Sequence, residues 1–162
     1  MDRSCLLCVG SQSVLTDLIS KRKDSGEKDY MKYVFAIPMK DSVSVSALRL
    51  TPEVQTIIPN EEFLHPGYCG EECRDLLVTN VEFKNDKDLF AIVGIEAPGC
   101  GYTTYDIVFP QGRTDRGENS RDASMREFAE ETGIKIDTSK HPLFLGFVGK
   151  RKEMSVYAYR MS

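Results

Sequence analysis

The chain has no tryptophan, only two histidines and no long hydrophobic run. Any stacking on a base must therefore use tyrosine or phenylalanine. The N-terminal apolar stretch, residues 5–10, is too short for a signal-peptide core or a membrane span, so we expect an intracellular, cytoplasmic protein. Positive charge is not in excess either. The formal net charge of -4 argues against a protein that coats nucleic acid through a basic surface.

The only basic triplets are residues 21–23 and residues 150–152. Runs this short usually form solvated surface. They leave open a local basic site that contacts RNA.

Cysteine is also sparse, with five residues and no secretory signal, which favours reduced thiols over a disulfide framework. Cys5, Cys8, Cys69 and Cys73, with His65 nearby, have the ligand types of a zinc site. The two cysteine pairs are about 60 residues apart, which is not a diagnostic spacing. Buried or surface thiols are therefore the favoured interpretation, with zinc as the alternative.

What is present is the balance of a single globular domain: 162 residues, of which 41% are hydrophobic and 28% charged. We expect residues 1–40 to form an N-terminal extension, with a helix and a strand, packed on the core. Residues 41–162 then form the main domain.

Hydrophobic periodicity predicts a mixture of strands and helices. Ser13 is a plausible N-cap for a short amphipathic helix. Residues 33–37 resemble a buried strand, and residues 42–47 and 54–58 a hairpin. Further strands are expected at residues 76–83, 89–95, 105–109, 143–148 and 155–159. Together with one long helix they predict an α/β or α+β sandwich.

The long helix is predicted over residues 121–132. Asn119 or Ser120 can cap it, Asp122 lies in its first turn, and Gly133 is the expected stop. Glu127, Glu130 and Glu131 are spaced i, i+3, i+4 and share one face, whereas the opposite face carries Met125, Phe128 and Ala129.

Three carboxylates held this close repel one another unless a cation neutralises them. Hard oxygen ligands without histidine or cysteine select Mg²⁺ or Mn²⁺. An acidic helix face alone is usually only solvated. Here the fixed distances to Gly112 and Glu118, outside the helix, favour a site.

The whole run from residue 112 to residue 134 resembles the Nudix box, G-x5-E-x7-R-E-U-x-E-E-x-G-U, where U is a bulky apolar residue. No position departs from it, and the matching residues are Gly112, Glu118, Arg126, Glu127, Phe128, Glu130, Glu131, Gly133 and Ile134. The resemblance implies an α/β/α sandwich with a mixed β-sheet and a loop-helix-loop catalytic motif. Residues 41–162 would be the Nudix hydrolase domain.

The resemblance also implies a metal-dependent pyrophosphohydrolase that cleaves a phosphate anhydride in a nucleotide-like substrate. The implied catalytic residues are Arg126, Glu127, Glu130 and Glu131; the metal ligands are Glu118, Glu127, Glu130 and Glu131; and Gly112 and Arg113 would contact substrate. Arg126 can hold Glu130 at i, i+4. A further carboxylate often follows the box in this family, and Glu153 is the candidate, although an exposed surface glutamate is the more common case.

The residues flanking the box are similar to those of mRNA-decapping, diphosphoinositol and dinucleoside polyphosphate Nudix hydrolases, in particular the decapping proteins of large DNA viruses. We therefore expect hydrolysis of the mRNA 5′ cap, with capped RNA as partner and 7-methylguanosine diphosphate as product. The alternative is a small-molecule hydrolase of dinucleoside polyphosphates, diphosphoinositol phosphates or ADP-ribose. A catalytically weak Nudix binding module is the second alternative. The short segment after the box leaves a homodimer open.

Overall fold

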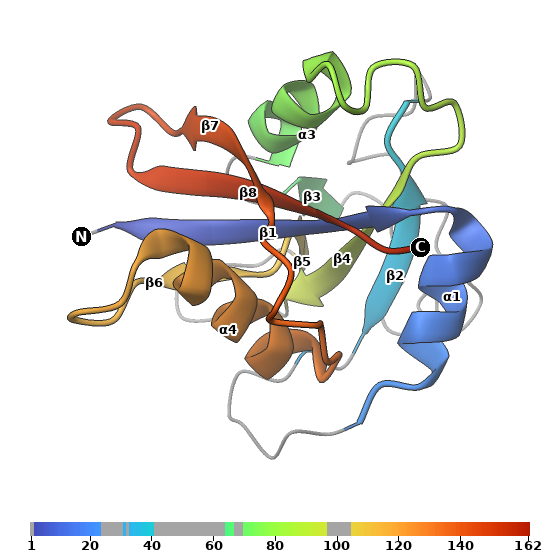
Figure 1. Cartoon of the computed structure of the whole chain (residues 1–162), viewed down its shortest axis with the longest axis horizontal. Helices are drawn as coiled ribbons and strands as arrows, with labels where there is room; N and C mark the ends of the chain where they lie inside the picture. Colours follow the sequence, from blue (N-terminus) through green and yellow to red (C-terminus); the bar gives the residue numbers. More distant parts are fainter. Residues whose placement is uncertain (1, 24–30, 32, 41–63, 67–69, 97–104) are drawn as a thin grey trace.

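The computed structural model describes residues 2–23, 31, 33–40, 64–66, 70–96 and 105–162. These residues form one mixed sheet with helices on both faces (Figure 1). The elements are β1 (Arg3–Gly10), α1 (Gln12–Ser20), β2 (Val34–Pro38), β3 (Leu64–Pro66), α3 (Gly70–Thr79), β4 (Phe90–Glu96), β5 (Tyr105–Val108), β6 (Gln111–Arg113), α4 (Ser120–Thr132), β7 (Leu143–Val148) and β8 (Met154–Arg160).

The sheet order is β3-β5-β4-β1-β8-β7, with β2 paired to β4 and β6 paired to β1. β1 lies in the middle, parallel to β8 on one side and antiparallel to β6 and β4 on the other. Its apolar run therefore forms a strand covered on both faces. The domain boundary at residue 40 stays a prediction. β1 and β2, which precede it, pair with strands of the same sheet that holds β8.

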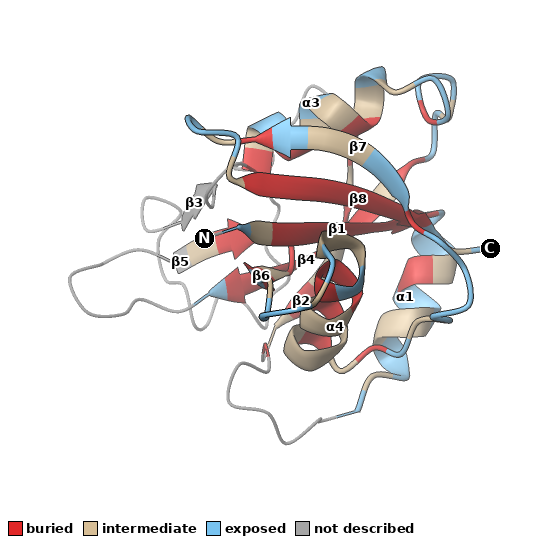
Figure 2. Cartoon of the chain, turned by 60° about the vertical axis from the view of Figure 1, so that its left-hand side comes forward, coloured by how far each residue is buried: buried red, intermediate tan, exposed pale blue. Residues whose placement is uncertain are grey.

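Two apolar cores lie on the two faces of the sheet (Figure 2). Successive residues of β1 point alternately into them, so Leu7 faces the core beneath α3 and Leu6 faces the core beneath α1 and α4. Leu77 contributes from α3, and Phe128 from α4. This arrangement confirms the predicted three-layer α/β/α sandwich.

Most of the predicted strands are confirmed to within a residue or two, at β2, β4, β5, β7 and β8. The strand expected at residues 76–83 is wrong, because that stretch begins inside helix α3. Glu71 and Glu72 occupy its first turn, and Cys73 and Leu77 are buried four residues apart, as on a helix. The hairpin expected at residues 42–58 lies outside the described residues.

The first helix begins earlier than the sequence indicated. The Ser11 hydroxyl, rather than that of Ser13, accepts a hydrogen bond from the Val14 amide at 3.3 Å. Within the described ranges, no helix combines the length and apolar character needed to cross a membrane.

The zinc alternative is wrong for the first cysteine pair. Cys5 and Cys8 are both buried, but Cys5 belongs to the core beneath α3 and Cys8 to the core beneath α4. Residues three apart on a strand point to opposite faces, so these thiols cannot bind one ion. Burial raises the pKa of Cys8 to about 12. Cys69 lies outside the described residues.

Candidate active site

Helix α4 presents the box residues at the surface of the sandwich. Of the two predicted caps, Asn119 is the one used: its side chain accepts from the Asp122 amide at 2.8 Å. Gly133 ends the helix with a φ of 70°, and its amide donates to the Ala129 carbonyl at 2.9 Å. Phe128 is fully buried. The helix is therefore fixed on the sheet by one face, and the other face is available for chemistry.

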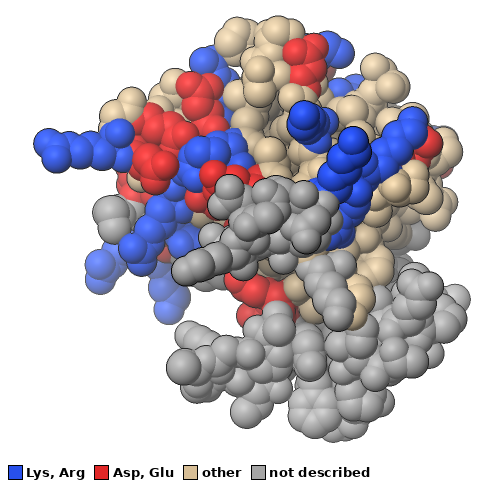
Figure 3. All heavy atoms as spheres, turned by 90° about the horizontal axis from the view of Figure 1, so that it is seen from below, with Lys and Arg blue, Asp and Glu red and all other residues tan. Residues whose placement is uncertain are grey.

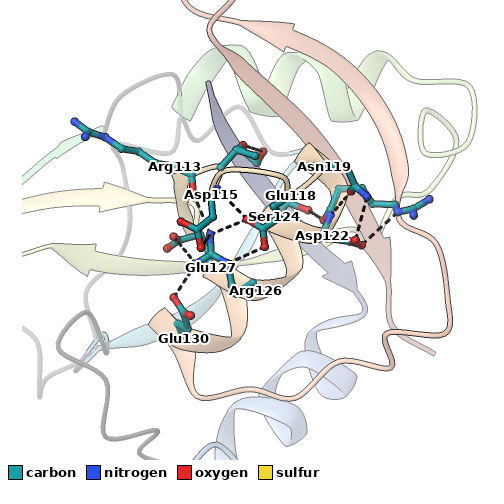
Figure 4. Close-up of polar contacts among 12 residues, drawn as sticks. Arg113, Asp115, Glu118, Asn119, Asp122, Ser124, Arg126, Glu127 and Glu130 are labelled. Atoms are coloured by element: carbon teal, nitrogen blue, oxygen red, sulfur yellow. Dashed lines mark hydrogen bonds and ion pairs between the residues drawn. The ribbon is translucent and has the colours of Figure 1, made fainter. Parts of the chain in front are cut away.

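Arg126 is the centre of this exposed face (Figure 4). Its Nε and Nη2 donate to the two carboxylate oxygens of Glu118 at 2.9 and 3.0 Å. Its Nη1 donates to Glu127 at 3.0 Å and to Glu130 at 3.1 Å. The predicted pair of Arg126 and Glu130 is thus confirmed. One guanidinium brings together three of the box carboxylates.

The opposite charges of Arg126 and its carboxylate partners stabilise each other's ionised forms. Hydrogen bonding to Glu118, followed by that to Glu127, raises the pKa of Arg126. The hydrogen bond from Arg126 in turn lowers the pKa of Glu118. Glu118 also accepts from the Asp115 amide at 3.1 Å, a hydrogen bond within the loop that precedes the helix. Arg126 and Glu118 are therefore both charged at neutral pH.

Gly112 lies on β6, opposite Ser4 of β1. A Cβ atom at this position would overlap the carboxyl group of Glu127. A side chain at this position would therefore displace the Glu127 carboxyl group, and glycine allows that group to approach the strand. Glu131 also reaches β6, where it accepts the amide of Gln111 at 3.0 Å.

Glu127, Glu130 and Glu131 are the residues that could hold a metal ion. Their donors are hard oxygens on one face of one helix, and these fit Mg²⁺ or Mn²⁺ in chemistry. As the side chains stand, Arg126 and the Gln111 amide engage them. Across the described part of the chain, no three acidic, histidine or cysteine side chains are gathered closely enough to hold an ion.

A pocket of about 350 Å³ opens beside Glu131, within the size range of ligand clefts. It is lined by Arg3, Met31, Glu96, Asp106, Val108, Gln111 and Glu131. Glu96 and Asp106 lie opposite each other in the register of β4 and β5. These two residues and Arg3 were not predicted from the sequence, because strand register alone brings them to the box and no local motif marks them.

The remaining predicted residues lie at the margins of the cluster. Arg113 accepts from Arg126 through its carbonyl at 3.0 Å, while its exposed side chain extends away from Glu127 (Figure 4). Its contact with substrate stays a prediction. Glu153 lies just before β8 and accepts the Arg151 amide at 2.9 Å, which gives it a structural role in the turn. Its part in catalysis also stays a prediction.

The basic triplets lie at two separate places. Residues 21–23 follow α1 and line a small pocket with Lys135, and residues 150–152 are exposed in the turn between β7 and β8. On the face that carries α1 and α4, acidic and basic side chains are mixed (Figure 3). The described part of this face is therefore not a uniformly basic surface.

One comparison with known proteins gives a match. The model of the NUDIX domain matches residues 78–160, just over half of the 162 residues. That stretch holds the complete box together with strands β4 to β8. No curated protein and no solved structure matches the chain.

Proposed function

Because the chain belongs to the NUDIX domain family, we propose that it hydrolyses a phosphate anhydride in a nucleotide-derived substrate, with Mg²⁺ or Mn²⁺ as cofactor. Hydrolysis of diphosphate-linked nucleosides is the general chemistry of this family. The observation that carries the proposal is the set of box carboxylates arranged around Arg126, next to a pocket of about 350 Å³.

Each box residue has a role in this proposal. Glu127, Glu130 and Glu131 hold the metal, and Glu118 anchors Arg126 or joins the ligands directly or through water. A bound Mg²⁺ or Mn²⁺ would offset the diphosphate charge and lower the pKa of the attacking water. Glu127 or Glu130 accepts the proton of that water. Arg126 is a positioning residue, since its hydrogen bonds go to the carboxylates.

Charge-neutral substitutions test these roles. Glu130→Gln and Glu131→Gln should each lower metal-dependent hydrolysis by more than about 100-fold, beyond the usual cost of losing an outer-shell partner. Both side chains are only partly buried, so circular dichroism should show an unchanged fold. Glu82→Gln, on an exposed residue after α3, is the matched control and should be fully active. Undiminished hydrolysis by either box variant would contradict the assignment.

For the substrate, we propose the 5′ cap of mRNA, with release of 7-methylguanosine diphosphate. Support comes from the residues flanking the box and from the exposed basic residues 150–152. Substituting Lys150, Arg151 and Lys152 by alanine should impair hydrolysis of capped RNA and spare small substrates. Equal losses on both would rule out an RNA-contacting role for this turn.

Two other functions are tested by the same assays. Dinucleoside polyphosphates, diphosphoinositol phosphates and ADP-ribose are the small-molecule alternatives, and product analysis on these beside cap-labelled RNA distinguishes them. A binding module without turnover is the second alternative. It is disfavoured because the chain keeps every carboxylate of the box.

A further inference from the structure

Exposed hydrophobic side chains are concentrated on one strand. Of the four large ones in the described residues, Leu143, Phe144 and Phe147 lie on β7, with 39%, 45% and 54% of their surface exposed; the fourth is Val81. Contiguous exposed apolar surface marks binding sites in soluble proteins. β7 therefore presents a candidate binding surface outside the box.

An irregularity in β7 places both phenylalanines on the same face of the sheet. Phe144 pairs with Tyr157, and after a register shift Phe147 pairs with Ser155. The Phe144 and Phe147 rings meet edge to face, with centroids 5.1 Å apart, and Phe144 also packs against Tyr157 at 5.3 Å. Phe147 still exposes more than half of its surface. An aromatic wall thus faces solvent.

This wall bounds a second pocket of about 360 Å³, here called the aromatic pocket. Its lining residues are Asp2, Thr114, Glu118, Ser120, Phe144, Phe147, Ser155 and Tyr157. Hydroxyl and carboxylate oxygens therefore surround the rings. Oxygen acceptors beside exposed aromatic rings suit a planar ligand that carries N–H groups. The two carboxylates, of Asp2 and Glu118, disfavour a phosphate in the same place.

The aromatic pocket and the pocket beside Glu131 lie at opposite ends of α4. Ser120, which lines the aromatic pocket, is the first residue of the helix, and Glu131 is near its end. The helical rise puts these residues about 16 Å apart along the axis. Glu127 and Glu130 lie between them. Glu118 links the aromatic pocket to this cluster, because it both lines the pocket and binds Arg126.

We propose that the aromatic pocket binds a nucleobase of the substrate, stacked on Phe144 and Phe147. This inference rests on the proposed hydrolase function and deepens it. A base at one end of α4 and a second group in the pocket beside Glu131 place the phosphate chain at Glu127 and Glu130. The preferred substrate class therefore carries a nucleoside on one side of the phosphate chain and a second group on the other.

The test is equilibrium binding of a non-hydrolysable diguanosine triphosphate analogue, with methylene groups in place of the bridging oxygens of the phosphate chain, measured by calorimetry with Mg²⁺ present. Phe144→Ala and Phe147→Ala should each weaken binding roughly tenfold, the effect of losing one stacking ring. Phe147→Tyr should bind like the wild type because it keeps the aromatic face. Leu143→Ala is the matched control: it lies on the same strand but pairs with Ala158, on the opposite face of the sheet. Binding of methylenediphosphonate with Mg²⁺, which has no base and cannot be hydrolysed, should be the same in all variants.

Several outcomes would overturn the inference. They are an absence of binding to the wild type, unchanged affinity in both alanine variants, and equal losses for the ligands with and without a base. Sedimentation velocity of the same proteins tests whether β7 instead joins two copies of the chain in a dimer. If the wild type is a dimer that Phe147→Ala dissociates without changing ligand affinity, this surface is an interface between two copies of the chain and not a base site. Since the assay measures no turnover, its failure is distinct from failure of the proposed hydrolysis.

Discussion

Arg126 shows how much of the box depends on the shape of one side chain. Its planar guanidinium directs separate N–H groups at Glu118, Glu127 and Glu130. Lysine would carry the same charge on a single nitrogen and could not reach these three carboxylates with the same geometry. The cluster therefore requires the fork of arginine in addition to its charge.

We predict that Arg126→Lys lowers kcat by roughly 10- to 100-fold, the usual cost of losing an outer-shell partner. The carboxylates lose their fixed positions although the net charge is unchanged. Steady-state kinetics measure the effect, and circular dichroism checks the fold. Arg116→Lys, at an exposed position of the same loop, should retain full activity. Wild-type kcat in Arg126→Lys would contradict the positioning role.

Gly112 and Gly117 are glycines for two different physical reasons, and substitutions can distinguish them. A Cβ at Gly112 would overlap the Glu127 carboxyl group, whereas one at Gly117 would meet open space but at a φ of +81°. Gly112→Ala should therefore lower kcat by more than about tenfold, because a metal ligand is displaced. Gly117→Ala should cost only about 1 kcal/mol of stability and retain activity. Kinetics and urea unfolding of both variants test this, and similar kcat values would refute it.

At the scale of single residues, the sequence predicted the site residues within the box and did not predict the pocket residues outside it. Helical spacing alone places Glu127, Glu130 and Glu131 on one face. Arg3 and Asp106 reach the neighbouring pocket only through the pairing of β1 and β5 with distant strands, which no local pattern encodes. For the first cysteine pair the zinc alternative failed for a different reason: the two-residue period of β1 places Cys5 and Cys8 on opposite faces of the sheet.

Among the elements, α3 is where local pattern was misleading. A short apolar run such as residues 76–78 is compatible with a strand or a helix, and length alone did not distinguish them. In the structure Leu77 is fully buried in the core between α3 and the sheet. Glu72, also on α3, accepts a hydrogen bond from the Gly149 amide at 3.1 Å. The helix thereby covers the face of the sheet opposite α4.

The packing of α3 gives a stability prediction. Leu77→Ala should lower the free energy of unfolding by about 2–5 kcal/mol, because it removes a buried side chain from the core. Val81→Ala should change it by less than about 0.5 kcal/mol, since Val81 is 74% exposed. Urea unfolding at neutral pH measures both. Comparable losses in the two variants would show that α3 does not pack as described.

For the molecule as a whole, one ion pair connects segments far apart in the sequence. Arg160, at the end of β8, binds Asp86 after α3 at 2.7 Å, and its guanidinium lies over the Phe83 ring. Hydrogen bonding to Arg160 is the main cause that lowers the pKa of Asp86. A carboxyl group with a lowered pKa stabilises the fold above its unfolded pKa, and this contribution is lost as pH falls through the folded value.

We therefore predict that Asp86→Asn lowers stability at pH 7 by at most about 1 kcal/mol, because both side chains are partly exposed and solvent screens the pair. Below about pH 4 the difference between variant and wild type should shrink as Asp86 is protonated. Urea unfolding at a series of pH values from 7 to 3 tests this. A difference that grows on acidification would contradict the assigned direction.

The central place of β1 has a consequence for how the chain folds during synthesis. β1 is synthesised before the other described strands of the sheet, yet its partner β8, paired from Arg3–Met154 to Val9–Arg160, is synthesised after them. Until then one apolar edge of β1 has no strand beside it, and such edges promote aggregation. Pairing across almost the whole chain also slows folding, because a long loop must close first. Nascent chains that stall before residue 154 should therefore depend on chaperones far more than chains that extend past residue 160.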